Sequence, residues 1–134
     1  MQKLKDKVAV VTGGARDIGR AISLKLAKEG AKVVVNYFNT ESDGTETVRL
    51  IKESGGEAIA VYADVTNQED INNMVAKTKE AFGEHIDILV NNAGGLFARR
   101  TIEEVDREFY DLVMNVNFMS VVFVTQAYLS LIHI

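Results

Sequence analysis

Short apolar runs alternate along this chain with longer segments in which apolar residues recur at helical spacing. The runs are rich in β-branched residues and show little alternation of apolar with polar side chains, which is typical of strands covered on both faces. Strand, helix, strand with parallel neighbours implies right-handed crossovers and a doubly wound sheet that binds ligands at the carboxyl ends of its strands. We therefore predict an α/β fold with a parallel sheet, whose strands lie at Val8–Val11, Val33–Val35, Ala58–Val61 and Ile86–Val90.

Apolar stripes at helical spacing predict helices between these strands. One stripe lies within residues 18–26 and is followed by Gly30, and a second lies within residues 71–82 and is followed by Gly83. Glycine is a frequent residue just past a helix end, so both glycines predict helix stops.

Two Ser/Thr-x-x-Glu patterns predict helix starts, because this spacing lets two side chains satisfy the first unpaired helix amides. The patterns are Thr66 with Glu69 and Thr101 with Glu104. The second one opens a helical pattern that extends to Asn115.

Composition excludes several classes of protein. The chain has 15 Lys and Arg against 19 Asp and Glu, a net charge of -4, which is too acidic for a generic binder of nucleic-acid backbones. It has no Cys, hence no disulfide framework, no thiolate nucleophile and no Cys-based metal site. The segment Met1–Lys7 leads into a short apolar run and not a signal-peptide core, and we expect that no stretch approaches the length needed to span a bilayer. We expect a cytoplasmic protein that binds no metal, nucleic acid or membrane.

A glycine-rich loop, Thr12–Gly19, lies between the first predicted strand and the first apolar stripe. Glycines at this position let backbone amides approach a pyrophosphate at a helix N-terminus, where the helix dipole favours negative charge. An ordinary strand-to-helix turn is the alternative interpretation of the loop alone.

Two further strand ends lie at the same edge of the predicted sheet, namely Asp64-Val65-Thr66 and Asn91-Asn92-Ala93-Gly94. Together with the loop, they resemble the N-terminal half of a short-chain dehydrogenase/reductase, a family with a Thr-Gly-x-x-x-Gly-x-Gly loop, an Asp-Val pair and an Asn-Asn-Ala-Gly strand end. The similarity covers residues 5 to about 128 and is general to members such as 3-oxoacyl-carrier-protein reductases. It implies a Rossmann-type fold truncated after about four strands, in a parent oxidoreductase that transfers hydride between a nicotinamide and a carbonyl or alcohol substrate. It also implies that the parent is a homo-oligomer.

The resemblance assigns binding roles to the three segments. The cofactor phosphates would lie along Gly13, Arg16, Ile18 and Gly19, the adenine beside Asp64 and Val65, and the ribose and nicotinamide beside Asn92, Ala93 and Gly94. Asn91 is expected to brace the sheet instead.

The end of the second strand bears on the choice of cofactor. An Asp or Glu there normally accepts from the ribose 2′-hydroxyl of NAD, but this strand runs into Asn36, Tyr37 and Phe38. Arg16 is placed to pair with a 2′-phosphate, so NADP is favoured, with Tyr37 at the site. The alternative for Arg16 is a solvated charge in the loop. Glu41 could reach the ribose 2′-hydroxyl, so NAD is an alternative cofactor.

One residue departs from the family pattern, since the middle glycine of the loop is Asp17. Its carboxylate is favourable near a helix N-terminus but would compete there with an anionic ligand for the same amides. Outward orientation of the side chain is the alternative.

By the same resemblance, Asn117 is the catalytic asparagine, which in the family interrupts a helix and holds a water of a proton relay. The alternative is a helix-junction asparagine that satisfies backbone groups, and both roles are compatible. An apolar helix, Phe118–Tyr128, follows it and is expected to be core or oligomer interface.

The family's catalytic Ser and its Tyr-x-x-x-Lys pair would lie beyond residue 134. Each of the four tyrosines is followed, four residues on, by a residue other than Lys: these positions are Glu41, Thr66, Met114 and Ile132. We therefore expect this chain alone to be inactive. A non-catalytic dinucleotide-binding module and a non-functional fragment are the alternatives, the latter because an exposed strand edge is prone to aggregate.

The last six residues, 129–134, can be encoded by the end sequence of a common transposon-based sequencing adaptor. We therefore expect a native region at 1–128 and a non-native tail at 129–134, in which His133 has no function. A genuine apolar helix end is the alternative. His85 is expected to be a surface loop residue.

Overall fold

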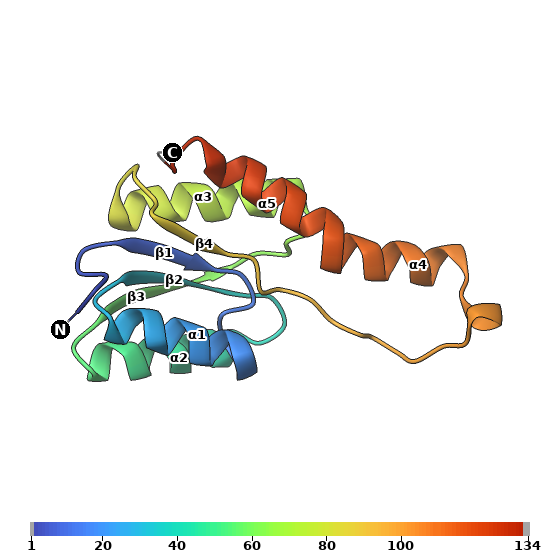
Figure 1. Ribbon diagram of the computed structural model, residues 1–134, viewed down its shortest axis with the longest axis horizontal. Coiled ribbons are helices and arrows are strands. Elements are labelled where there is room, and N and C mark those ends of the chain that lie inside the picture. The colour runs from blue at the N-terminus through green and yellow to red at the C-terminus, as the bar shows by residue number, and fades with distance from the viewer. Residues whose placement is uncertain (1, 133–134) are drawn as a thin grey trace.

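A computed structural model describes residues 2–132 and shows one parallel sheet with helices on both faces (Figure 1). The strand order is β3-β2-β1-β4, with every pair parallel. Helices α1 and α2 cover one face, and α3 and α5 cover the other. The bounds are β1 Val8–Val11, α1 Asp17–Lys28, β2 Lys32–Tyr37, α2 Glu41–Glu53, β3 Glu57–Tyr62, α3 Gln68–Phe82, β4 Ile88–Val90, a 3-10 turn Ile102–Glu104, α4 Arg107–Met114, a π-helical segment Asn115–Met119, and α5 Ser120–Leu129. The α/β fold with a doubly wound parallel sheet is confirmed.

Strand β1 lies inside the sheet and explains the unbroken apolar runs. Val8 and Val10 belong to the core under α3 and α5, whereas Ala9 and Val11 belong to the core under α1 and α2. Successive side chains of a strand point to opposite faces, so a strand buried on both sides needs apolar residues throughout.

The helices differ from the sequence prediction in two places. Helix α2 has no counterpart among the predicted elements, because its buried face carries Gly44 and Thr47 beside Ile51 and shows little apolar stripe. The helix start predicted at Thr66 is wrong, because Asn67 caps α3 by accepting from the Asp70 N–H at 3.0 Å.

The helix start predicted at Thr101 is confirmed as a capping box, but the box begins an element shorter than the predicted helix. Thr101 and Glu104 form the capping box, with the Glu104 carboxylate accepting from the Thr101 N–H at 3.0 Å. The box begins only the 3-10 turn, and α4 starts at Arg107, where Asp106 accepts from the Phe109 N–H at 2.8 Å.

The elements from α4 to α5 form one continuous helix of 23 residues, Arg107–Leu129. The sequence predicts two helices that meet near Asn117, but the π-helical segment carries the helix through that residue. By length and composition alone the helix could cross a membrane, so the expectation that no stretch approaches that length is wrong. Core helices of soluble proteins pass the same test.

The C-terminal residues are described up to Ile132, so residues 133–134, including His133, lie outside the described residues. Leu129 ends α5, and Leu131 is 8% exposed and packs in the core under α3 and α5. The Leu131 carbonyl accepts from the Ile86 N–H at 3.0 Å. The proposed tail at 129–134 therefore contacts the rest of the fold at Leu131.

A carboxylate at the amino end of β4 joins β4 to β1. Asp87 accepts from the Val8 N–H at 2.9 Å and pairs with His85 Nε2 at 2.8 Å, and Lys7 Nζ lies 3.7 Å away. Burial raises the pKa of this carboxyl, but the hydrogen bonds from Val8 and His85 and the charges of His85 and Lys7 outweigh burial, so the pKa lies below its usual value.

A depressed carboxyl pKa contributes stability that is present above the unfolded-state pKa and is lost as pH falls through the folded-state pKa. We expect Asp87→Asn to lower the free energy of unfolding by about 1.5–3 kcal/mol at pH 7, the range for a hydrogen bond to a charged group. Urea denaturation at a series of pH values below 7 should show a steeper acid loss in the parent chain than in the variant. Parallel curves for the two chains would contradict this role.

Candidate functional site

The carboxyl ends of the strands surround an open cleft of about 440 Å³. The ten residues that the sequence places at the cofactor, nine by resemblance and Tyr37 by its position at the end of the second strand, all line it, together with residues that the sequence did not single out. The lining residues are Gly13, Ala15, Arg16, Asp17, Ile18, Gly19, Asn36, Tyr37, Phe38, Asn39, Thr40, Asp43, Ala63, Asp64, Val65, Asn92, Ala93, Gly94, Phe97 and Val116. Three strand ends and one loop thus meet in one place, as a doubly wound sheet requires.

The glycine loop leads from β1 into the N-terminus of α1 and leaves its backbone open to the cleft. Gly13 has a φ of 58°, a conformation that glycine adopts without strain. A Cβ on Gly19 would lie 1.9 Å from the Gly13 carbonyl oxygen, so only glycine fits there. The loop can therefore present amides and the helix dipole to an anion.

Asn36, at the end of β2, holds the loop in place. Its side chain is buried, and its Oδ1 accepts from the Gly13 N–H at 2.9 Å. Its Nδ2 donates to the carbonyls of Val61 at 3.3 Å and Ala63 at 3.1 Å on the β3 side. No role for Asn36 was predicted, although a single amide side chain directly after three buried valines is a detectable signal in the sequence.

The end of β4 is fastened to the same loop through Thr12. The Thr12 Oγ1 accepts from the backbone N–H groups of Asn92 and Ala93, both at 3.0 Å. Asn92 Nδ2 donates to the Gly13 carbonyl at 3.0 Å. Asn91 points elsewhere and donates to Thr125 Oγ1 at 3.0 Å, so it braces β4 against α5.

The turn after β3 fixes Asp64 at the wall of the cleft. Asp64 Oδ1 accepts from the Thr66 N–H at 2.9 Å and from the Thr66 hydroxyl at 2.6 Å. The Asp64 N–H donates to Asp70 Oδ2 at 2.9 Å, a contact that the sequence analysis did not anticipate. Val65 is buried beside it.

Asp17 has a φ of 51°, the left-handed region that costs a side chain strain and that glycine enters freely. The Asp17 side chain is 87% exposed, which matches the outward orientation, and its Oδ2 lies 3.8 Å from Arg16 Nε. No side-chain cap is formed at the start of α1. The Asp17 carboxylate therefore pairs with the cation that would meet a 2′-phosphate and leaves the helix amides open.

Tyr37 closes the far side of the cleft. Its ring packs against the backbone of Gly44, where a Cβ would lie 2.6 Å from it, and meets Tyr62 edge-on at 6.0 Å between centroids. Burial, then the negative charge of Glu41 and of an ionised Tyr62, raises the pKa of Tyr37. The phenol therefore stays neutral and can act as a hydrogen-bond donor.

Asn117 lies in the π-helical segment, next to Val116 of the cleft. Its Oδ1 accepts from the Gly95 N–H at 3.0 Å, and its Nδ2 donates to the carbonyls of Gly95 at 2.8 Å and Val113 at 2.9 Å. The side chain thus satisfies backbone groups of the helix and of the loop after β4. Isolated π-helical turns are frequent at functional sites.

Metal ligands are not clustered in the described part of the chain, where no group of three or more His, Cys, Asp or Glu side chains could hold a metal ion. His85, which pairs with Asp87, lies before β4 at the amino end of the sheet, away from the cleft.

A parallel sheet whose glycine loop enters a helix, with polar strand ends around one cleft, defines an α/β protein of the Rossmann type. A family model described as short chain dehydrogenase matches residues 7–133. The chain belongs to the short-chain dehydrogenase/reductase family, and the resemblance found in the sequence is confirmed.

Relatives and solved structures agree with this assignment. An uncharacterized oxidoreductase of Methylorubrum extorquens is 44% identical over 127 residues, 95% of this chain and 50% of the relative. A hydroxynaphthalene reductase-like protein of Metarhizium robertsii is 41% identical over 131 residues, 97% of this chain and 48% of the relative.

Among solved structures, a Serratia marcescens short-chain dehydrogenase/reductase variant aligns with a TM-score of 0.92 at 34% identity, covering 97% of this chain and 52% of that one. A Burkholderia cenocepacia short chain dehydrogenase in complex with NADP aligns with a TM-score of 0.90 at 37% identity, covering 97% and 52%. The chain thus spans about half the length of the proteins it matches.

Proposed function

We propose that the chain binds a nicotinamide dinucleotide in the cleft, with NADP(H) preferred over NAD(H). The observation that carries this proposal is the convergence of the glycine loop, Asp64-Val65 and Asn92–Gly94 on one open cleft. Arg16 supports the preference because β2 ends in Asn36 and Tyr37, with no carboxylate to accept from a ribose 2′-hydroxyl. The NADP bound to the Burkholderia relative is consistent with it.

The residues of the cleft fit the parts of such a cofactor. The amides at the N-terminus of α1, around Gly19, suit the diphosphate, and the guanidinium of Arg16 suits a 2′-phosphate. Val65 and the carboxylate of Asp64 offer an apolar wall and an acceptor to a base, and Asn92–Gly94 face the ribose and nicotinamide. When bound, the nicotinamide supplies the carbon that gives or takes a hydride.

For the whole protein we propose a carbonyl or alcohol oxidoreductase in which Asn117 orders the loop after β4 and holds a water near the reacting carbon. Its three hydrogen bonds to Gly95 and Val113 support the ordering role. The 134 residues contain no Tyr-x-x-x-Lys, so on its own the chain should bind cofactor without turnover. A non-catalytic dinucleotide-binding module would have the same cleft.

Equilibrium titration of the chain with NADPH and with NADH, followed by calorimetry, tests the proposal. We expect saturable binding of both, with NADPH tighter by about tenfold, the worth of one charge-assisted contact. Equal affinities would overturn the NADP preference, and the absence of binding by either would overturn the function.

The departure at Asp17 leads to a prediction about cofactor affinity. Asp17→Asn removes the carboxylate beside Arg16 and keeps a residue type that tolerates the left-handed backbone. We expect NADPH to bind about threefold to tenfold more tightly, because a repulsive charge near the phosphates is lost and Arg16 is released. NADH should gain less, since it has no 2′-phosphate.

Asp17→Gly separates charge from backbone strain, because it also removes the cost of a side chain at positive φ. It should match Asp17→Asn in NADPH affinity and exceed it in melting temperature. Weaker NADPH binding in both variants would show instead that the Asp17 carboxylate supports the site.

A further inference from the structure

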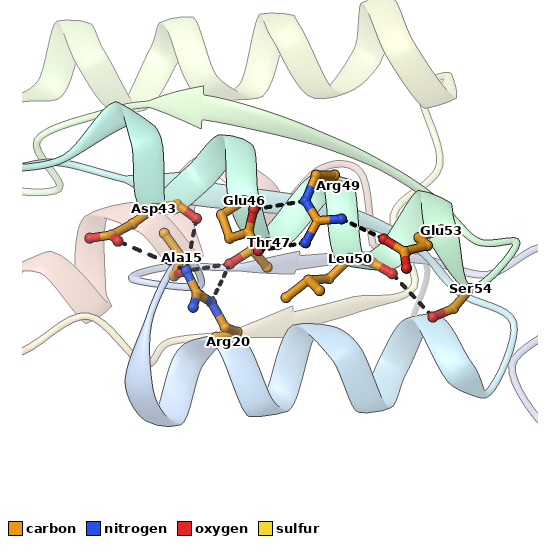
Figure 2. A network of polar contacts seen from close by, with 9 residues as sticks. All are labelled: Ala15, Arg20, Asp43, Glu46, Thr47, Arg49, Leu50, Glu53 and Ser54. Atoms are coloured by element: carbon orange, nitrogen blue, oxygen red, sulfur yellow. Dashed lines mark hydrogen bonds and ion pairs between the residues drawn. The ribbon is translucent and has the colours of Figure 1, made fainter.

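Arg20 lies on α1, and its side chain reaches across to α2 (Figure 2). Its Nε–H is shared between the Ala15 carbonyl at 3.0 Å and Thr47 Oγ1 at 2.8 Å. Its Nη2 donates to the Asp43 carbonyl at 3.3 Å and lies 3.9 Å from the Asp43 carboxylate. One guanidinium therefore joins the glycine loop to the first half of α2.

Thr47 completes this contact from the α2 side. Its side chain is fully buried, and its Oγ1 donates to the same Ala15 carbonyl at 2.5 Å. The Ala15 carbonyl thus accepts from two side chains, both outside the loop. Buried groups with this many partners hold one geometry, because losing a partner leaves a desolvated polar atom.

The peptide held in this way is the one that links Ala15 to Arg16. Arg16 has an extended backbone, with φ of -148° and ψ of 167°, so the orientation of this peptide sets where its side chain leaves the loop. On the other side, Asp43 lies in the first turn of α2, three residues after Thr40 of the cleft. Arg20 therefore fixes two walls of the cleft relative to each other.

The charge of Arg20 has a second effect on the cleft, because Asp43 also lines it. With Arg20 beside it, the Asp43 carboxylate is partly neutralised. Without Arg20, an unpaired carboxylate would line the same cleft as Arg16, where it would repel a phosphate and accept from a hydroxyl.

We propose that Arg20 is a positioning residue that sets the preference for a 2′-phosphorylated cofactor, by orienting the Ala15–Arg16 peptide and neutralising Asp43. The inference rests on the proposed cofactor binding and goes beyond it, since Arg20 itself does not line the cleft. It predicts that changes at Arg20 alter the ratio of NADPH to NADH affinity and not merely the stability of the fold.

Calorimetric titration of the full chain with NADPH and NADH tests this ratio. Arg20→Gln should weaken NADPH binding about tenfold while NADH changes less than about twofold, because the freed Asp43 carboxylate and a misoriented Arg16 act on the extra phosphate more than on the diphosphate that both cofactors carry. Arg49→Gln is the matched control: Arg49 lies on the outer side of α2, paired with Glu46 and Glu53, and its loss removes the same charge (Figure 2). It should leave the ratio unchanged.

Asp43→Asn supplies a second test that does not require loss of Arg20. On its own, it should leave the ratio of NADPH to NADH affinity equal to or above that of the parent chain. Combined with Arg20→Gln, it should restore most of the lost NADPH affinity. An unchanged ratio in Arg20→Gln, an equal fall in Arg49→Gln, or a fall in Asp43→Asn alone would each overturn the inference. If the parent chain binds neither cofactor, the proposed function itself fails, which is a distinct result.

Discussion

Gly19→Ala is expected to abolish measurable binding of NADPH and NADH. A Cβ at this position would lie 1.9 Å from the Gly13 carbonyl oxygen and 2.8 Å from Asn92 Nδ2. The first of these atoms belongs to the backbone, so no side-chain rotation relieves the clash and the loop has to move. Because the amides of the loop are the proposed phosphate cradle, we expect affinity to fall by at least about 100-fold. The free energy of unfolding should fall by about 1–3 kcal/mol from overpacking.

Gly55→Ala is the control for that result. Gly55 has a φ of 89° and nothing within 4 Å of its Cβ position, and it lies in the turn between α2 and β3, at the opposite end of the sheet. The substitution should cost about 1 kcal/mol from backbone strain alone and leave cofactor affinity unchanged. Calorimetry for binding and urea denaturation for stability measure both effects. Retained NADPH binding in Gly19→Ala would contradict the placement of the phosphates on the loop.

Tyr128→Ala is expected to lower the free energy of unfolding by about 3–5 kcal/mol, the cost of removing a large buried side chain. Tyr128 of α5 is fully buried in the core under α3 and α5, and its hydroxyl lies 2.9 Å from Thr78 Oγ1 of α3. Thr78 donates to the Met74 carbonyl at 2.8 Å, so Tyr128 is the donor to Thr78. Burial raises the pKa of Tyr128 to about 12, so the phenol stays protonated at neutral pH.

Tyr128→Phe separates the ring from the hydroxyl. It should cost only about 1 kcal/mol, because Thr78 keeps its bond to Met74 and loses one neutral hydrogen bond. Tyr110→Ala serves as a control on the same long helix, since Tyr110 is 50% exposed and should change stability by less than about 0.5 kcal/mol. Equal losses in urea denaturation for Tyr128→Ala and Tyr110→Ala would contradict the burial of Tyr128.

The strands were predictable from sequence because a strand buried on both faces leaves an unbroken apolar run, as Val8–Val11 does. Helix α2 was not predictable, because its buried face carries no apolar stripe. On that face Gly44 allows close packing of Tyr37, and Thr47 donates a hydrogen bond to Ala15. The start of α3 was misplaced by one residue, because Asn67 caps the helix and the hydroxyl of Thr66 donates to Asp64 instead.

The cleft residues were predictable where glycine or polar residues directly follow a predicted strand, as in the glycine loop and Asn92–Gly94. The hydrogen bonds that hold the cleft residues in place were not predictable, because they join residues far apart in the chain. Asn36 reaches the loop 23 positions away, and Thr47 reaches Ala15 across 32 positions. Single-sequence patterns report local spacing and carry no information on such pairs.

The most direct test of the central claim is a titration of the ¹⁵N-labelled chain with NADPH, followed by amide chemical shifts. We predict that the largest changes fall on the loop amides of Gly13 and Gly19, on Val65, and on Gly94, with little change at Gly55 on the opposite end of the sheet. Changes centred away from the carboxyl ends of the strands, or none at saturating NADPH, would contradict the assignment of this cleft as the dinucleotide site.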